Sequence, residues 1–136
     1  MLVPPPFYFK DVSDQGLLDY YERFIEGVNR TSLRTCLYHI PLVSGAGLSV
    51  SVVKLLRDKY PTTIVGIKDR SGDCTNTDQL LQMENLIVYP GRELSLVEAM
   101  KLGAPGCISA TANLNTQQIV NVINHCEHHN WRHRPL

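Results

Sequence analysis

The stretch Ile64-Val65-Gly66-Ile67-Lys68-Asp69-Arg70-Ser71-Gly72-Asp73 determines how the rest of the chain is interpreted. Its apolar first half predicts a short strand that is buried on both faces, as the strands of parallel sheets are. Because side chains alternate across a strand, Gly66 and Lys68 are expected on one face, with Gly66 clearing space beneath the lysine. A partly desolvated lysine presents a neutral amine more readily, and a neutral amine is a nucleophile toward carbonyls. On this strand alone, a lysine that reaches solvent past the strand end is the more common arrangement.

The length of 136 residues predicts one domain spanning residues 1–136. The chain has 13 basic and 13 acidic residues and 43% hydrophobic residues, which is enough for a packed core. Its balanced charge favours neither nucleic acid nor a membrane as a partner. The four cysteines form no Cys-x-x-Cys pair and are expected as free thiols, with Cys36 and Cys107 buried. No signal peptide is visible, so a cytoplasmic location is expected.

Strand and helix patterns alternate along the chain. Strands are predicted at residues 1–3, 33–38, 64–68, 86–89 and 106–109, and helices at 13–28, 49–60, 76–83, 93–102 and 116–127. A flexible loop is expected at residues 44–47, and residues 131–136 fit no element. Alternation at this pitch predicts an α/β fold of parallel βα units, whose strands carry ligand sites at their carboxyl ends.

Four motifs in this chain resemble those of one known family. They are Leu37-Tyr38-His39-Ile40-Pro41, Gly66-Ile67-Lys68-Asp69 with Ser71-Gly72-Asp73, Pro90-Gly91, and Gly106-Cys107-Ile108-Ser109-Ala110-Thr111-Ala112-Asn113. Together they resemble the dihydrodipicolinate synthase / N-acetylneuraminate lyase family from about Val3 to about Val122. The resemblance implies a (β/α)8 barrel of the TIM type that works through a lysine Schiff base.

The resemblance covers only part of that barrel, from the end of its fourth strand to its eighth helix. The family's glycine- and threonine-rich loop, which holds the pyruvoyl carboxylate, has no counterpart in the printed sequence. The expected fold is therefore a truncated partial barrel. Its open edges and bare core side are expected to favour pairing with a partner.

The resemblance also implies the roles of individual residues. Lys68 is expected to form the Schiff base with pyruvate or another 2-keto acid, and Tyr38 to carry protons to and from the substrate oxygen. Gly91 and Ile108 match site-lining positions, although a turn glycine and a core isoleucine fit the same letters. Tyr8 matches a tyrosine that inserts into a neighbouring subunit's site, so a homo-oligomer is expected. No cofactor is expected.

Departures from the family pattern bear on the substrate. Val43 occupies the place where dihydrodipicolinate synthases carry a carboxylate-binding arginine, and Leu94 the place where neuraminate lyases carry an acidic residue. The predicted function is therefore an aldolase or dehydratase for a 2-keto-3-deoxy sugar acid or related compound. Arg70 or Arg92 is expected to hold the substrate's distal hydroxyls or acid group. A solvated surface arginine is an equally weighted alternative at either position.

Two other functions remain open. One is a non-catalytic half-barrel that binds an anion or a partner chain, with the anion held by Gly91 and the loop 103–106. The other is dihydrodipicolinate synthase itself. In each case the chain alone is expected to be weakly active at most. The residues His125, Cys126, His128, His129 and His133 lack paired metal-ligand spacing, so no metal site is expected.

Overall fold

The structure is a computed structural model that describes residues 1–30 and 32–128. Strands and helices alternate through nearly all of this part of the chain. In order they are β1 (Leu2–Val3), α1 (Asp14–Val28), β2 (Thr35–His39), α2 (Pro41–Ser44), α3 (Val50–Lys59), β3 (Ile64–Asp69), α4 (Cys74–Leu81), β4 (Ile87–Pro90), the 3-10 turn η1 (Glu93–Ser95), α5 (Leu96–Lys101) and α6 (Ala112–His128).

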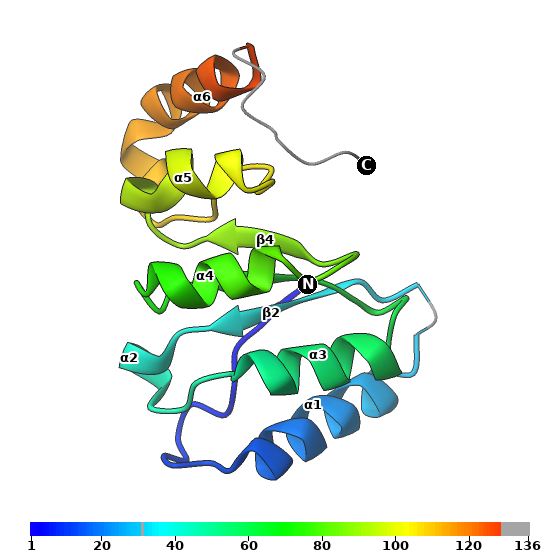
Figure 1. Ribbon diagram of the computed structural model, residues 1–136. Helices are drawn as coiled ribbons and strands as arrows, with labels where there is room; N and C mark the ends of the chain where they lie inside the picture. Colours follow the sequence, from blue (N-terminus) through cyan, green and yellow to red (C-terminus); the bar gives the residue numbers. More distant parts are fainter. Residues whose placement is uncertain (31, 129–136) are drawn as a thin grey trace.

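The four strands form one sheet in the order β1-β2-β3-β4, and every neighbouring pair is parallel. Each long helix packs against the next one along the chain, α1 on α3, α3 on α4, α4 on α5 and α5 on α6. Figure 1 shows this succession, with α1 at one end of the molecule and α6 at the other. A parallel sheet followed by helices in chain order has the geometry of one part of a (β/α)8 barrel wall.

The two faces of the sheet differ in how well they are covered. On the outer face Leu37, Ile67 and Val88 are buried in one core with side chains from the helices. On the inner face Leu2 and Ile87 are 38% and 43% exposed. These two residues lie at opposite ends of one register row across the sheet. The inner face is therefore the less covered side of the core.

Gly66 lies in this inner row and has a different role from the predicted one. A Cβ on Gly66 would be 2.6 Å from the carbonyl oxygen of Ile87 and 3.1 Å from Sγ of Cys36. Glycine is needed here because β2 and β4 approach it closely on both sides. The freed space is occupied by these neighbours and not by the Lys68 side chain.

Side-chain caps explain where three helices begin. Ser13 and Ser49 accept hydrogen bonds from the backbone N–H groups of Gly16 and Val52, so α1 and α3 begin where predicted. Asp73 accepts from the N–H of Thr75 in the same way. This cap starts α4 two residues earlier than predicted.

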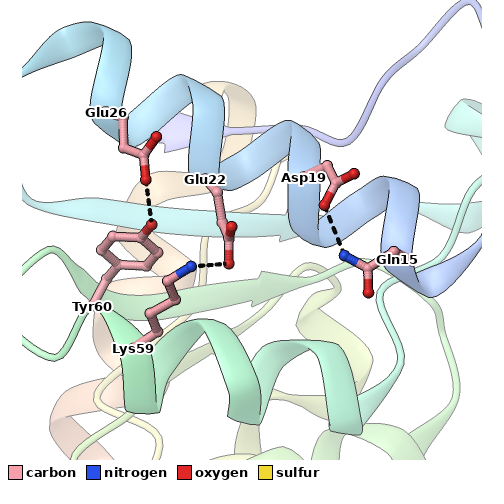
Figure 2. Close-up of polar contacts among 6 residues, drawn as sticks. All are labelled: Gln15, Asp19, Glu22, Glu26, Lys59 and Tyr60. Carbon is pink, nitrogen blue, oxygen red and sulfur yellow. Dashed lines mark hydrogen bonds and ion pairs between the residues drawn. The ribbon is translucent and has the colours of Figure 1, made fainter.

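Polar contacts join α1 to the end of α3 at the surface (Figure 2). The Lys59 ammonium lies 2.7 Å from the Glu22 carboxylate, and the Tyr60 hydroxyl donates to Glu26 at 3.2 Å. Exposed pairs of this kind contribute little to stability, because water solvates the separated groups almost as well. The two helices are held mainly by their buried side chains, among them Tyr21 of α1.

Three predicted elements differ in the structure. Residues 106–109 do not form a strand, because only the Ile108 N–H reaches β4, donating to the Pro90 carbonyl at 3.2 Å. The helix predicted at 93–102 is divided into η1 and α5. The last helix begins at Ala112 and is kinked at Asn115, so only the part after the kink corresponds to the prediction.

A fourth difference lies just after β2. Residues 41–44 form the single helical turn α2, where the sequence predicts a turn and a flexible loop. The Ser44 hydroxyl donates to the Ile40 carbonyl at 2.8 Å and closes this turn. Gly45 then ends it with a φ of +71°, which glycine adopts without steric cost.

All four cysteines are free. Cys36 and Cys107 were expected to be buried but are half-buried, since Cys36 lies on the less covered face and residues 106–109 form no strand. Burial still raises the pKa of both thiols. Residues 131–136 lie outside the described part of the chain. No helix within residues 1–30 and 32–128 combines the length and apolarity needed to cross a bilayer.

Candidate active site

The carboxyl edge of the sheet carries a row of three polar side chains on its inner face. The parallel register pairs Tyr38 with Lys68 and Lys68 with Tyr89. Lys68 Nζ donates a hydrogen bond to the Tyr38 hydroxyl at 3.0 Å and lies 4.2 Å from the centre of its ring. Because only 8% of Lys68 is exposed, its amine does not extend into bulk water. A solvated strand-end lysine is therefore not the arrangement observed.

A cavity of about 240 Å³ opens at this pair. Four residues that the sequence singled out line it together: Tyr38, Lys68, Arg70 and Arg92. The rest of its lining consists of Ile40, Leu42, Val43 and Ala110.

Sequence reasoning missed part of this lining. It weighed Val43 only as a missing arginine, and it gave no role to Ile40, Leu42 or Ala110. The signal for Ile40 and Leu42 was their place just after a strand end, where parallel sheets carry their sites.

Three predicted site residues do not line the cavity. Gly91 is buried, and its N–H donates to the Asp69 carbonyl at 2.7 Å. Ile108 is half-buried on the segment that follows α5. Tyr8 is 85% exposed and contacts Phe9 edge-on, with ring centres 5.5 Å apart. These three residues are therefore not among the residues that line the cavity with Lys68 and Tyr38.

On the other face of the same strands, Asp69 is almost fully enclosed. Its carboxylate accepts hydrogen bonds from the N–H of Ser71 at 2.9 Å, the side-chain amide of Asn76 at 3.0 Å and the hydroxyl of Thr77 at 2.7 Å. These bonds join the end of β3 to the first turn of α4. They fix the backbone directly after Lys68, so Asp69 is suited to position the amine.

His39 is the register partner of Asp69 and is also buried. Its Nδ1 accepts a hydrogen bond from the N–H of Leu48 at 2.8 Å, which requires that nitrogen to be unprotonated. Burial lowers the pKa of His39, and the nearby Asp69 carboxylate opposes this shift without cancelling it. His39 is therefore a neutral side chain that anchors the loop after α2.

Glu93 lies beside the cavity and is held by the Ser109 hydroxyl, which donates to it. This hydrogen bond is the main reason that the pKa of Glu93 is lowered, and the positive charge of Arg70 adds to the effect. The neighbouring Leu94 is 95% exposed and does not line the cavity.

In the glycine loops that the sequence offers as an anion site, some backbone N–H groups already donate hydrogen bonds to carbonyl groups of the chain. The N–H of Gly103 donates to the Met100 carbonyl at 3.1 Å, as that of Gly91 does to Asp69. Within the described ranges, no three His, Cys, Asp or Glu side chains are grouped as a metal ion would require. His129 and His133 of the candidate metal cluster lie outside those ranges.

Comparison with known proteins identifies the family. The sequence model of the dihydrodipicolinate synthetase family matches residues 1–132. The chain belongs to this family. It is 30% identical over 127 residues to 4-hydroxy-tetrahydrodipicolinate synthase 2 of Clostridium acetobutylicum, covering 92% of this chain and 43% of that protein. The chain thus spans less than half the length of this family member.

Solved structures of the family agree with the fold. Dihydrodipicolinate synthase from Agrobacterium tumefaciens superposes with a TM-score of 0.86 at 33% identity, over 92% of this chain and 44% of that one. YagE of Escherichia coli K12, solved in complex with pyruvate, gives a TM-score of 0.84 at 27% identity, over 96% and 44%. The predicted partial (β/α)8 barrel is confirmed.

Proposed function

We propose that Lys68 forms a Schiff base with pyruvate or another 2-keto acid, and that the chain carries the reactive amine of a lyase. One observation carries this proposal. The Lys68 amine is nearly buried at the carboxyl edge of a parallel sheet, 3.0 Å from a phenol hydroxyl, and both groups line one cavity. The pyruvate complex of the related YagE supports the same class of substrate.

The geometry suits the chemistry of imine formation. The neutral Lys68 amine attacks the keto carbon, and the resulting carbinolamine loses water to give an iminium ion. When the C3–C4 bond breaks, its electron pair moves into the iminium, which becomes an enamine. In a dehydration, loss of a C3 proton gives the enamine first, and the enamine electron pair then expels the C4 oxygen, which is protonated and leaves as water. The Tyr38 hydroxyl is placed to hand a proton to the departing water and to take one from a substrate hydroxyl. Protonation of the enamine and hydrolysis then release the keto acid and restore the amine.

The finer part of the proposal concerns the substrate. Val43 offers no guanidinium to a carboxylate, so the second substrate of dihydrodipicolinate synthase lacks one of its contacts. The proposed substrate class is therefore a 2-keto-3-deoxy sugar acid or a related 2-keto acid, with Arg70 and Arg92 available to its far end. The isolated chain is expected to be weakly active, because it spans less than half of a whole family member.

Borohydride trapping tests this function. A chain incubated with pyruvate and sodium borohydride should gain the mass of one reduced adduct, and Lys68→Ala should gain none. Lys54→Ala, which removes an exposed lysine on α3, is the matched control and should still be trapped. Circular dichroism should show that Lys68→Ala keeps the native helix content. The function is wrong if the unmodified chain gives no adduct, or if the folded Lys68→Ala variant still gives one.

An exposed aromatic loop supports a further part of the proposal, a homo-oligomer. Phe7, Tyr8 and Phe9 are 59%, 85% and 68% exposed. Three successive exposed aromatic rings are typical of a surface that contacts another protein. Replacing all three with serine should shift the chain to a smaller species in sedimentation velocity. An unchanged sedimentation coefficient would contradict this part.

A further inference from the structure

Two arginines that line the cavity each pack against a glycine in the loop that carries the other arginine. The loop after β3 carries Arg70 and Gly72, and the loop after β4 carries Gly91 and Arg92. A Cβ on Gly91 would lie 2.7 Å from Cδ of Arg70, and a Cβ on Gly72 would lie 2.9 Å from Cζ of Arg92. Each arginine therefore occupies the space that a side chain on the other loop's glycine would need.

This reciprocal arrangement is a property of the backbone and not only of two flexible side chains. Gly72 has a φ of +79°, a conformation that other residues adopt only with strain. A Cβ on Gly91 would also lie 2.9 Å from the carbonyl oxygen of Asp69, which cannot move away freely. The two glycines thus let the loops come close enough for both arginines to line one cavity.

The charge around the cavity is one-sided. Lys68, Arg70 and Arg92 line it, and none of its lining residues is a carboxylate. Neither guanidinium makes a hydrogen bond or an ion pair with any residue in ranges 1–30 and 32–128. The carboxylate of Glu93 already accepts a hydrogen bond from the Ser109 hydroxyl, and this bond and the charge of Arg70 lower the pKa of Glu93. Both arginines therefore keep unfilled hydrogen-bond capacity beside a cavity that suits an anion, and Arg92 also lines a neighbouring cavity with Asp73 and Glu98.

The remaining side chains that line the cavity indicate what the uncharged part of the ligand should be. Ile40, Leu42 and Val43 offer only apolar side chains to the cavity. A sugar chain with several hydroxyl groups would lose hydrogen bonds to water against such side chains. A short methylene chain would not. This contrast separates keto dicarboxylates from the sugar acids that the sequence favours.

We propose that Arg70 and Arg92 together bind a second carboxylate at the far end of a short 2-keto acid. The inference rests on the proposed function, because the Lys68 imine fixes the keto carbon at the other end of the ligand. The substrate class is then a 2-keto dicarboxylate, and the arginine pair determines specificity. Guanidinium groups match carboxylates through paired N–H donors, which a lysine at the same place would not reproduce.

A matched pair of ligands tests this proposal. 2-Oxoglutarate and 2-oxopentanoate have equal chain length and differ only in a terminal carboxylate or methyl group. In borohydride trapping at low and constant ionic strength, half-maximal labelling should need about tenfold less 2-oxoglutarate than 2-oxopentanoate. In Arg70→Gln and in Arg92→Gln this ratio should fall to near one. Arg23→Gln, which removes an exposed arginine on α1, should keep the ratio of the unmodified chain.

The outcomes separate this proposal from the function on which it rests. If both ligands label the chain with equal dependence on concentration, or if both arginine variants keep the ratio, the proposal is overturned. If Arg70→Gln weakens labelling by the two ligands equally, the arginine binds the carboxylate next to the keto group, which also overturns it. If no keto acid labels Lys68, the Schiff-base function is wrong. Carboxylate binding by Arg70 and Arg92 is then tested by calorimetry. Glutarate should bind more tightly than pentanoate, and Arg70→Gln should abolish the difference.

Discussion

Tyr38–Lys68 and His39–Asp69 are adjacent pairs on the same two strands, and they face opposite sides of the sheet. On the outer side, the Asp69 carboxylate accepts three hydrogen bonds and His39 holds the chain at Leu48. On the inner side, the Lys68 amine has a single hydrogen-bond partner among residues 1–30 and 32–128, the Tyr38 hydroxyl, and both residues line a cavity. The outer pair is enclosed and stabilises the edge of the sheet, whereas the inner pair lines a cavity. Substitutions should therefore separate stability from reactivity across a distance of one residue.

Asp69→Ala should give the largest loss of stability. It leaves the amide of Asn76 and the N–H of Ser71 without their acceptor and the Thr77 hydroxyl with only the Asp73 carbonyl, at a cost of about 3 kcal/mol in the free energy of unfolding. Urea unfolding followed by circular dichroism measures this. Asp78→Ala on the exposed side of α4 is the control and should change stability by less than about 0.5 kcal/mol. Equal losses in the two variants would contradict the stabilising role of Asp69.

Tyr38→Phe should affect the inner pair in the opposite way. Loss of the hydroxyl should slow borohydride-trapped imine formation by about a hundredfold, because a general acid contributes on that order, and should leave the unfolding midpoint nearly unchanged. Tyr89→Phe is matched to it, since Tyr89 lies on the other side of Lys68 in the same row but does not line the cavity. If both variants slow trapping equally, the phenol at Tyr38 has no special role.

Gly91→Ala tests the close packing of Gly91 against Arg70 and the Asp69 carbonyl. Its new Cβ would meet both Arg70 and the Asp69 carbonyl, so stability should fall by about 2 kcal/mol. The preference for 2-oxoglutarate should fall with it. A Cβ on Gly27 in α1 would lie more than 4 Å from every atom outside its chain neighbours and its own helix backbone, so Gly27→Ala should be neutral or stabilising by up to about 1 kcal/mol. A Gly91→Ala chain as stable as Gly27→Ala would refute the close approach of the two loops.

The smallest effect concerns pH. The pKa of His39 is lowered in the folded chain, so near neutral pH His39 is neutral in both states. As the pH falls through the unfolded value of about 6.5, the unfolded state takes up the proton first, and stability falls until the folded pKa is passed. Urea unfolding between pH 7 and pH 5 should show this decline, and His39→Gln should show a flatter one. His128→Gln, at the exposed end of α6, should keep the original slope. If His39→Gln keeps the slope as well, the buried imidazole is not its source.

Local patterns predicted much of the fold and the neighbouring placement of Tyr38 and Lys68. The strands at 33–38, 64–68 and 86–89 follow from runs of β-branched and apolar residues, and their parallel order brings Tyr38 to Lys68 as expected. The strand at 106–109 failed because a strand exists only where its backbone finds partners, and only the Ile108 N–H finds one on β4. Composition alone cannot show that.

The crossing of Arg70 over Gly91 and of Arg92 over Gly72 was beyond prediction for a related reason. It depends on the relative placement of two loops that lie about 20 residues apart in sequence. The buried His39–Asp69 pair was not predicted, because side-chain partners of Asp69 lie on α4 and no local pattern marks a carboxylate as buried. Sequence therefore located the residues proposed to react, while the groups that hold them in place required the three-dimensional arrangement.

The most direct test is to locate the reduced adduct within the chain. The sequence has five lysines, of which Lys10, Lys54, Lys59 and Lys101 are solvent-accessible and Lys68 is nearly buried. After limited reduction with borohydride in the presence of pyruvate, tandem mass spectrometry of the digested chain should find the modification at Lys68 before any other lysine. Modification of the exposed lysines first, or of all five in proportion to their exposure, would contradict a reactive amine at Lys68.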